Sequence, residues 1–385
     1  MKTSQLLKTA TTMAALTTLT ISNVHAQSDG GFSEDQLDNV RSTPGTVVSG
    51  NKKLKLTLSG QVNRGILSYD DGDDSGSIFV DNDNSSTRIR LLSETPDQGG
   101  VRFGTNIELQ FESNSTASVD QENQHNVGPN SFTERKLEAY GDFAGIGRLT
   151  LGQGDTSSNG TSEQDLSGTG VIGYSGVADL ASGLKFRDSD GILTDIDIGS
   201  VFSNLDGLSR DDRLRYDTPD VNGLKGSVSL IADERWDVSA SYSLDLGIIK
   251  ARTALAYADV GEDLDNRING SFSLLHDSGF SLTFAAGRDD RDDRDPQFAY
   301  TKFGYQASWT SLGKTALSVD FYNGEDISIK NDESTSVGFQ LVQNLNSLGA
   351  ELYAGIRNYE LDLAGSTAAD LDDVLATLIG ARVKF

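Results

Sequence analysis

The sequence contains no cysteine, so neither a disulfide framework nor a thiolate metal site can form. It also lacks any run of about 18 apolar residues, which excludes a helical membrane protein. Basic residues number 32 against 57 acidic ones, and the net charge of −25 argues against nucleic acid as a partner. Only 5 prolines occur, and all stand in segments that we interpret as loops, because proline cannot donate inside a sheet. They are Pro44, Pro96, Pro129, Pro219 and Pro296.

Histidine is almost as rare, with 3 residues, of which His25 belongs to the N-terminal segment. His125 stands in a polar stretch and His276 beside a turn, and neither belongs to a recognisable nucleophile or metal signature. Carboxylates are too numerous to nominate one pair for glycoside hydrolysis. The sequence therefore predicts no enzyme, no catalytic residue, no metal site and no cofactor.

What is present begins with an export signal. Lys2 lies in a basic start, Ala10–Ile21 forms a short apolar core, and small residues lead up to Ala26. The core is shorter than the about 20 residues that a membrane span needs, so we predict cleavage between Ala26 and Gln27. An uncleaved helical anchor is the alternative. Residues 27–51 are polar and rich in Gly, Ser and Asp, and we interpret them as a flexible leader.

Residues 52–385 repeat one theme, a segment of alternating apolar and polar residues followed by a turn. Such period-two alternation indicates strands with one apolar face. In the last segment, Val374–Phe385, one face carries Arg382 and Lys384. The other face carries Leu375, Ile379, Val383 and Phe385. A strand with an apolar outer face and a charged inner face suits a wall between lipid and water.

The connections between these segments alternate in length. The short ones are Pro96–Gly100, Asp142–Gly147, Asp217–Gly223, Asp245–Gly247, Asp277–Gly279, Ser311–Gly313 and Asn346–Gly349. The longer, acidic ones are Asp70–Ser86, Ser113–Ser131, Asp259–Asp265, Asp289–Gln297, Gly324–Ser334 and Asp362–Asp373. We therefore predict an all-β fold, a transmembrane antiparallel β-barrel with short periplasmic turns and long extracellular loops. We predict sixteen strands, with eighteen as the alternative, because Leu184–Arg187 and Arg213–Tyr216 are the weakest members of the series. A barrel of this size leaves an aqueous channel.

Three segments resemble the Gram-negative general porins of the proteobacterial type. Arg135–Gln153 (RKLEAYGDFAGIGRLTLGQ) is similar to the hairpin that precedes the family's third loop, and Asp211–Leu224 (DDRLRYDTPDVNGL) resembles its "rYdsP" turn. The terminal GARVKF resembles the family's "G-x-R-x-x-F" ending. The resemblance implies a sixteen-stranded homotrimer in the cell outer membrane, in contact with lipid and lipopolysaccharide. It also implies a third loop that folds into the pore.

That third loop is then Gly154–Ser182, which has acidic residues and no basic one. The candidate acidic residues of the pore constriction are Glu163, Asp165 and Asp179. The candidate basic residues on the facing inner wall are Arg88, Arg90, Arg102 and Arg135, followed by Lys136, Lys185, Arg187, Arg213 and Arg215. An acidic loop opposite a basic wall places a field across the pore, which sorts solutes by charge. The alternative is that these charges pair in a wet lumen with Glu108, Glu112 and Glu138.

The predicted function is passive diffusion of small hydrophilic solutes and ions through a water-filled channel. The alternative is a barrel that transports nothing and serves adhesion or envelope structure. We interpret the acidic loops Asp70–Asp74 and Asp81–Asn84 as solvated surface whose charges repel one another. Ca2+ binding is the alternative, although the spacing of these residues does not match an EF-hand.

Overall fold

The computed structural model describes residues 54–128, 131–261, 266–364 and 370–385. The signal peptide predicted at residues 1–26, its cleavage site and the leader predicted at 27–51 lie outside these described residues.

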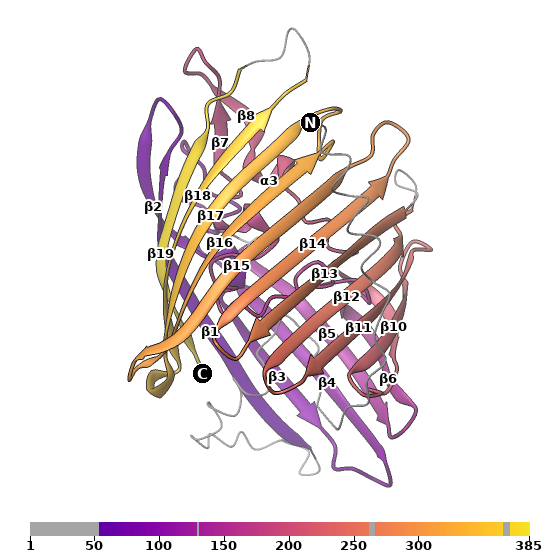
Figure 1. Ribbon diagram of the computed structural model, residues 1–385. Coiled ribbons are helices and arrows are strands. Elements are labelled where there is room, and N and C mark those ends of the chain that lie inside the picture. The colour runs from indigo at the N-terminus through magenta and orange to yellow at the C-terminus, as the bar shows by residue number, and fades with distance from the viewer. Residues whose placement is uncertain (1–53, 129–130, 262–265, 365–369) are drawn as a thin grey trace.

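One antiparallel sheet closes into a tilted barrel (Figure 1). Its strands in the first half of the chain are β1 (Lys55–Asp70), β2 (Ser75–Asp81), β3 (Arg88–Glu94), β4 (Val101–Phe111), β5 (Phe132–Phe143), β6 (Gly147–Asp155), β9 (Arg210–Asp217) and β10 (Leu224–Ile231). In the second half they are β11 (Trp236–Asp245), β12 (Ile249–Asp259), β13 (Asn266–His276), β14 (Phe280–Asp290), β15 (Gln297–Thr310), β16 (Gly313–Glu325), β17 (Glu333–Leu345), β18 (Ala350–Asp362) and β19 (Val374–Lys384). Closure comes from β1 and β19, which pair from Gln61 opposite Lys384 to Asp70 opposite Leu375.

The wall has sixteen strands in the described part of the chain, because β2 and β3 are two halves of one interrupted strand. β2 pairs with the second half of β1 and β3 with its first half. Between them residues 82–87 turn toward the lumen, where the Asn82 side chain donates to the Val171 carbonyl at 2.9 Å. The predicted barrel and its strand number are confirmed.

The two faces of the last strand are also as predicted. Ile379 is 58% exposed on the outer face, and Leu375, Val383 and Phe385 are exposed beside it. Arg382 and Lys384 point inward and both contact Glu351 of β18, at 2.5 and 2.6 Å. Among the described residues, no helix has the length and apolar character needed to cross a membrane.

Connection lengths separate the two ends of the barrel. The seven short turns predicted from the sequence join consecutive strands at one end, and the longer connections lie at the other, which we call the loop end. One prediction is wrong, that of a single long loop at Asp70–Ser86. The chain makes a short turn at 71–74 and continues as β2, where Ile78 and Val80 are buried on the inner face. Acidic and glycine residues before β2 hide this short apolar alternation.

The connection between β6 and β9, residues 156–209, is longer than the predicted third loop 154–182; we call it the inner loop. It contains η4 (Val177–Leu180), β7 (Lys185–Arg187), β8 (Leu193–Asp197) and α3 (Ile198–Val201). β7 pairs only with β8, in a separate two-stranded sheet. The interpretation of Leu184–Arg187 as a wall strand, with Lys185 and Arg187 on the basic inner wall, is therefore wrong. Its alternation arises because Phe186 is buried in a core that belongs to the inner loop.

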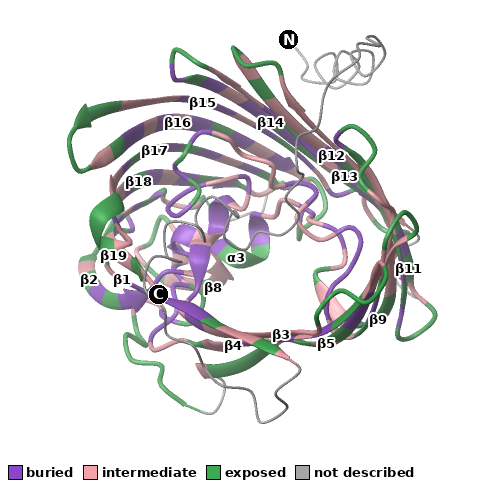
Figure 2. Cartoon of the chain, turned by 90° about the horizontal axis from the view of Figure 1, so that it is seen from below, coloured by how far each residue is buried: buried purple, intermediate pink, exposed green. Residues whose placement is uncertain are grey.

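That core fills one side of the lumen. The inner loop contributes Val171, Ile172, Val177, Leu180, Leu184, Phe186, Ile198 and Phe202, and the wall contributes Leu67, Ile78, Tyr322, Tyr353, Tyr359, Val374 and Leu378. Figure 2 shows α3 and β8 inside the ring of strands, beside β19, β1 and β2. The inner faces of the first and last wall strands are thus apolar near the loop end because they bury against the inner loop, not because they meet lipid.

Candidate pore constriction

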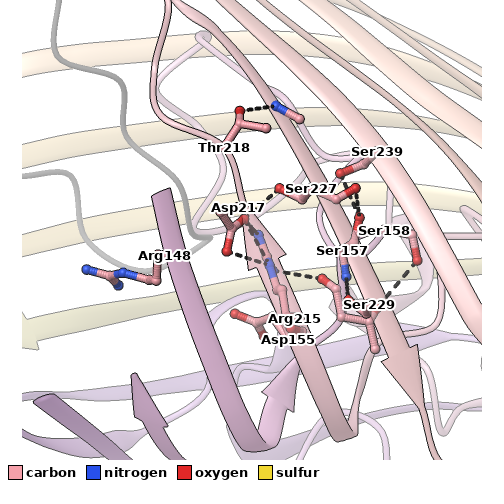
Figure 3. A network of polar contacts seen from close by, with 12 residues as sticks. Arg148, Asp155, Ser157, Ser158, Arg215, Asp217, Thr218, Ser227, Ser229 and Ser239 are labelled. Carbon is pink, nitrogen blue, oxygen red and sulfur yellow. Dashed lines mark hydrogen bonds and ion pairs between the residues drawn. The ribbon is translucent and has the colours of Figure 1, made fainter. Parts of the chain in front are cut away.

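The inner loop is fixed to the wall first at β10 and β11. The buried Asp237 carboxylate accepts the backbone N–H groups of Ser157 and Ser158 at 3.1 and 2.9 Å. Figure 3 shows Ser157 between Ser229 and Ser239, to which it bonds at 2.7 and 3.0 Å. A carboxylate that accepts two backbone donors holds the start of the loop against the inner face of the wall.

A second anchor lies on β13 and β15. The Lys302 ammonium, which is fully buried, donates to the Asp165 carboxylate at 2.7 Å and to the Gly173 carbonyl at 2.6 Å. Ser271 and Ser273 of β13 accept the backbone N–H groups of residues 164 and 166, each at 2.9 Å. Asp165, one of the three predicted constriction acids, is thus paired against the wall.

Three other carboxylates of the inner loop stay half-buried beside the pore, namely Glu163, Asp179 and Asp206. Burial raises the pKa of Asp179 to about 6, with a further rise from the nearby charge of Glu112, while Arg135 and the Tyr174 hydroxyl act against it. Burial also raises the pKa of Asp206 to about 6, although the N–H groups of residues 162 and 160 oppose the rise. The pKa of Glu163 lies well above its ordinary value because of burial and repulsion from the other two carboxylates. Glu163 and Asp179 were predicted from the sequence as constriction acids. Asp206 was not, because it lies beyond the predicted end of the loop at residue 182.

Three of the four predicted arginines gather around one carboxylate on the wall. Arg90 of β3 and Arg135 of β5 contact Glu108 of β4 at 2.5 and 2.9 Å, and Arg88 approaches it at 3.8 Å. Arg135 reaches the lumen because the register of β4 and β5 shifts beside it, so that Glu108 lies opposite Lys136 and Leu109 opposite residue 134. Three guanidinium groups around one carboxylate leave an excess of positive charge at this point of the wall.

The basic wall continues onto β6 and β9. Lys136 pairs with Asp155, and Arg210 contacts the same carboxylate at 2.8 Å. Arg213 contacts Glu138 at 2.5 Å. The wall cations therefore pair with Glu108 and Glu138, as the alternative interpretation predicts. The wall nevertheless keeps an excess of positive charge, because three arginines share the carboxylate of Glu108.

Arg102 lies apart from this group. It pairs with Asp142 at 3.5 Å near the turn end of β4, and its side chain is 48% exposed. Six residues separate it from Glu108 along the strand, which is about 20 Å. The structure therefore does not bring Arg102 together with Arg88, Arg90 and Arg135.

The loop acids and the wall cations face each other. Arg135 and Arg210 are among the cations whose charges act on Asp179 and Glu163, respectively. The core of the inner loop packs on the side of the lumen formed by β15–β19, β1 and β2, while the arginines come from β3, β5 and β9 (Figure 2). Among the described residues, no group of three or more His, Cys, Asp or Glu side chains could hold a metal ion.

Comparisons with known proteins agree with this architecture. The Gram-negative porin family profile matches residues 10–363. An anion-selective porin from Comamonas acidovorans superimposes with a TM-score of 0.57 at 17% identity, over 86% of this chain and 100% of the other. Salmonella typhi OmpF, in complex with daunomycin, gives 0.55 at 14% identity, over 88% and 99%. The trimer form of OmpT from Vibrio cholerae gives 0.54 at 12% identity, over 86% and 99%. No curated protein sequence matches the chain. The chain belongs to the Gram-negative porin family, and it forms an outer-membrane channel for passive diffusion.

Proposed function

We propose that this channel sorts small hydrophilic solutes and ions by charge, in the passage between the inner-loop acids and the basic wall. The observation that carries the proposal is the cluster of Arg88, Arg90 and Arg135 around the single carboxylate of Glu108. Charges that a solute touches in this passage act on it almost unscreened, whereas the charges of the outer loops are screened beyond about 8 Å at physiological salt.

Reversal potentials across a planar bilayer test the proposal. Neutralising Glu163, Asp179 and Asp206 together removes the negative side and is expected to move the reversal potential toward anions. Neutralising Arg90 and Arg135 is expected to move it toward cations. Asp233→Asn is the control, because this carboxylate is 90% exposed in the connection between β10 and β11, outside the inner loop. Unchanged reversal potentials in both constriction variants would refute charge sorting at this place.

We also propose a homotrimer, with a subunit contact on the outer face of β1. Arg64 stands between Val62 and Ile66 on that face, and its side chain is 40% exposed. Its guanidinium lies 2.6 Å from the Ser113 carbonyl and 3.6 Å from the Asp81 carboxylate. A basic residue that meets lipid near the bilayer centre costs about 2–4 kcal/mol. A second subunit over this face would remove that cost. Mass measurement in mild detergent should give three copies, and an active monomer would contradict the proposal.

Export follows the same reasoning. We propose that the signal peptide is cleaved after Ala26, so that the mature chain begins at Gln27 and contacts lipid and lipopolysaccharide in the outer membrane. The N-terminal sequence of the purified protein tests this, and an intact Met1 would contradict it. The proposed transport needs no cofactor and no catalytic residue. Nothing in the site favours the alternative of a barrel that only serves adhesion.

A further inference from the structure

The hairpin of β7 and β8 is a part of the inner loop that the constriction does not use. It rises to the loop end of the barrel, close to β2 and β18 (Figure 1). Its base is rooted in the core of the inner loop, since Phe186 is fully buried and Thr194 donates to the Phe186 carbonyl at 2.8 Å.

A paired arginine joins the hairpin to the turn between β1 and β2. Arg187 donates to both carboxylate oxygens of Asp71, at 3.0 and 2.9 Å, and to the Gly191 carbonyl at 3.0 Å. The Asp71 side chain is fully buried and that of Arg187 is 13% exposed. Such a two-bond contact fixes both the position and the orientation of the guanidinium.

Two further connections bind the same hairpin. Gln121, from the loop between β4 and β5, both donates to the Lys185 carbonyl at 2.7 Å and accepts the Lys185 N–H at 3.0 Å. In the connection between β18 and β19, the Asp372 N–H donates to the Arg187 carbonyl at 2.9 Å. One bridge places Asp188 opposite Leu371. The hairpin is thus attached to three loops that come from different strands.

We propose that this hairpin is a fixed cover over part of the extracellular entrance, held by the Arg187–Asp71 pair, and that it forms a second size filter before the constriction. It cannot swing away without breaking a buried ion pair and the hydrogen bonds to two other loops. The side of the entrance over β1, β2, β18 and β19 is therefore closed to solutes, which enter over the remaining strands. The proposal rests on the channel function.

Liposome swelling with neutral saccharides of increasing size tests it, because neutral probes do not respond to the charges of the pore. Arg187→Ala/Gln121→Ala removes the ion pair and the bonds to one further loop, so the cover should loosen and the largest saccharides should enter faster relative to the smallest than in the unmodified protein. The control is Arg235→Ala. Arg235 lies in the connection between β10 and β11, has a similar exposure and contacts Asp211 of β9 at 2.5 Å. No swelling of the unmodified protein with the smallest sugar would instead refute the channel itself.

A cross-link tests whether the cover is fixed. Asp188 and Leu371 face each other between two flanking backbone bonds, a position where Cα atoms lie about 4.5 Å apart, which suits a disulfide. The chain has no other cysteine, so the Asp188→Cys/Leu371→Cys variant can form only this internal bond. The oxidised form should keep the unmodified rates for every saccharide. Loss of flux on oxidation would overturn a fixed cover, and equal size dependence of Arg187→Ala/Gln121→Ala and Arg235→Ala would overturn the size filter.

Discussion

The anchor between Lys302 and Asp165 gives a prediction about how firmly the inner loop is held. Lys302→Met leaves the Asp165 carboxylate buried without its cation, and removing one partner of a buried pair costs about 3–5 kcal/mol. Asp165 keeps three donors, the Ser167 N–H at 2.7 Å, the Ser167 hydroxyl at 2.9 Å and the Thr283 hydroxyl at 3.4 Å, so we expect the lower end, about 3 kcal/mol. Since the pair joins the loop to the wall, the loss should appear as local opening of the loop rather than as unfolding of the barrel.

Hydrogen exchange measures this opening. The N–H groups of Ile172 and Gly173 bond to the Thr169 carbonyl at 3.0 and 3.1 Å and report on the anchored segment. A cost of about 3 kcal/mol raises the exchange of these amides roughly a hundredfold. The double variant Lys302→Met/Asp165→Asn removes both charges, so it should exchange more slowly than Lys302→Met alone. Unchanged exchange in Lys302→Met would refute the anchor, and equal exchange in both variants would refute its electrostatic origin.

Three further predictions concern the wall and the pore. Ala240 and Ser241 are neighbours on opposite faces of β11, so Ala240→Arg should lower the free energy of unfolding by about 2–4 kcal/mol, the cost of a charge on the lipid face, and Ser241→Arg should not. Urea unfolding measures both variants, and equal free energies would contradict the assigned faces. Asp179 and Asp206 have pKa values of about 6, so cation preference should fall from pH 7 to pH 5, and a variant that neutralises these two residues and Glu163 should lack this change. The folded chain binds more protons than the unfolded one between pH 3.8 and about 6, so these groups contribute stability as pH falls through 6. Arg102→Ala should leave the reversal potential unchanged, and a shift would place this residue in the constriction.

The alternation of apolar and polar residues was enough to predict the barrel, because the wall is a repeated local pattern. Each strand shows its two faces within a few residues, as Ile379 and Arg382 do, and short turns punctuate the series. The faces and the turns depend on neighbours in the sequence, and the sequence displays them directly. The loop that folds inward was located differently, by the resemblance of the hairpin at Arg135–Gln153 to the porin family.

Alternation alone could not distinguish a wall strand from a strand inside the lumen. Leu184–Arg187 alternates in the same way as the wall, yet Phe186 is buried in a core of the inner loop. The reason is that a buried face looks the same in sequence whether it packs against a loop or against lipid.

The charges of the pore show the same division. Acidic residues in the loop and arginines on the wall strands were visible in the sequence, and most of them lie in the pore. Which of them remain available to a solute was decided by contacts between distant segments. Asp165 is neutralised by Lys302, 137 residues away, and Arg135 enters the lumen through a local register shift. The sequence by itself determined the barrel and its faces, because these follow from local periodicity, while the inward loop was expected from the resemblance of its preceding hairpin to the porin family. Only the tertiary structure decided which charges pair, because pairing depends on register and on how the loop docks.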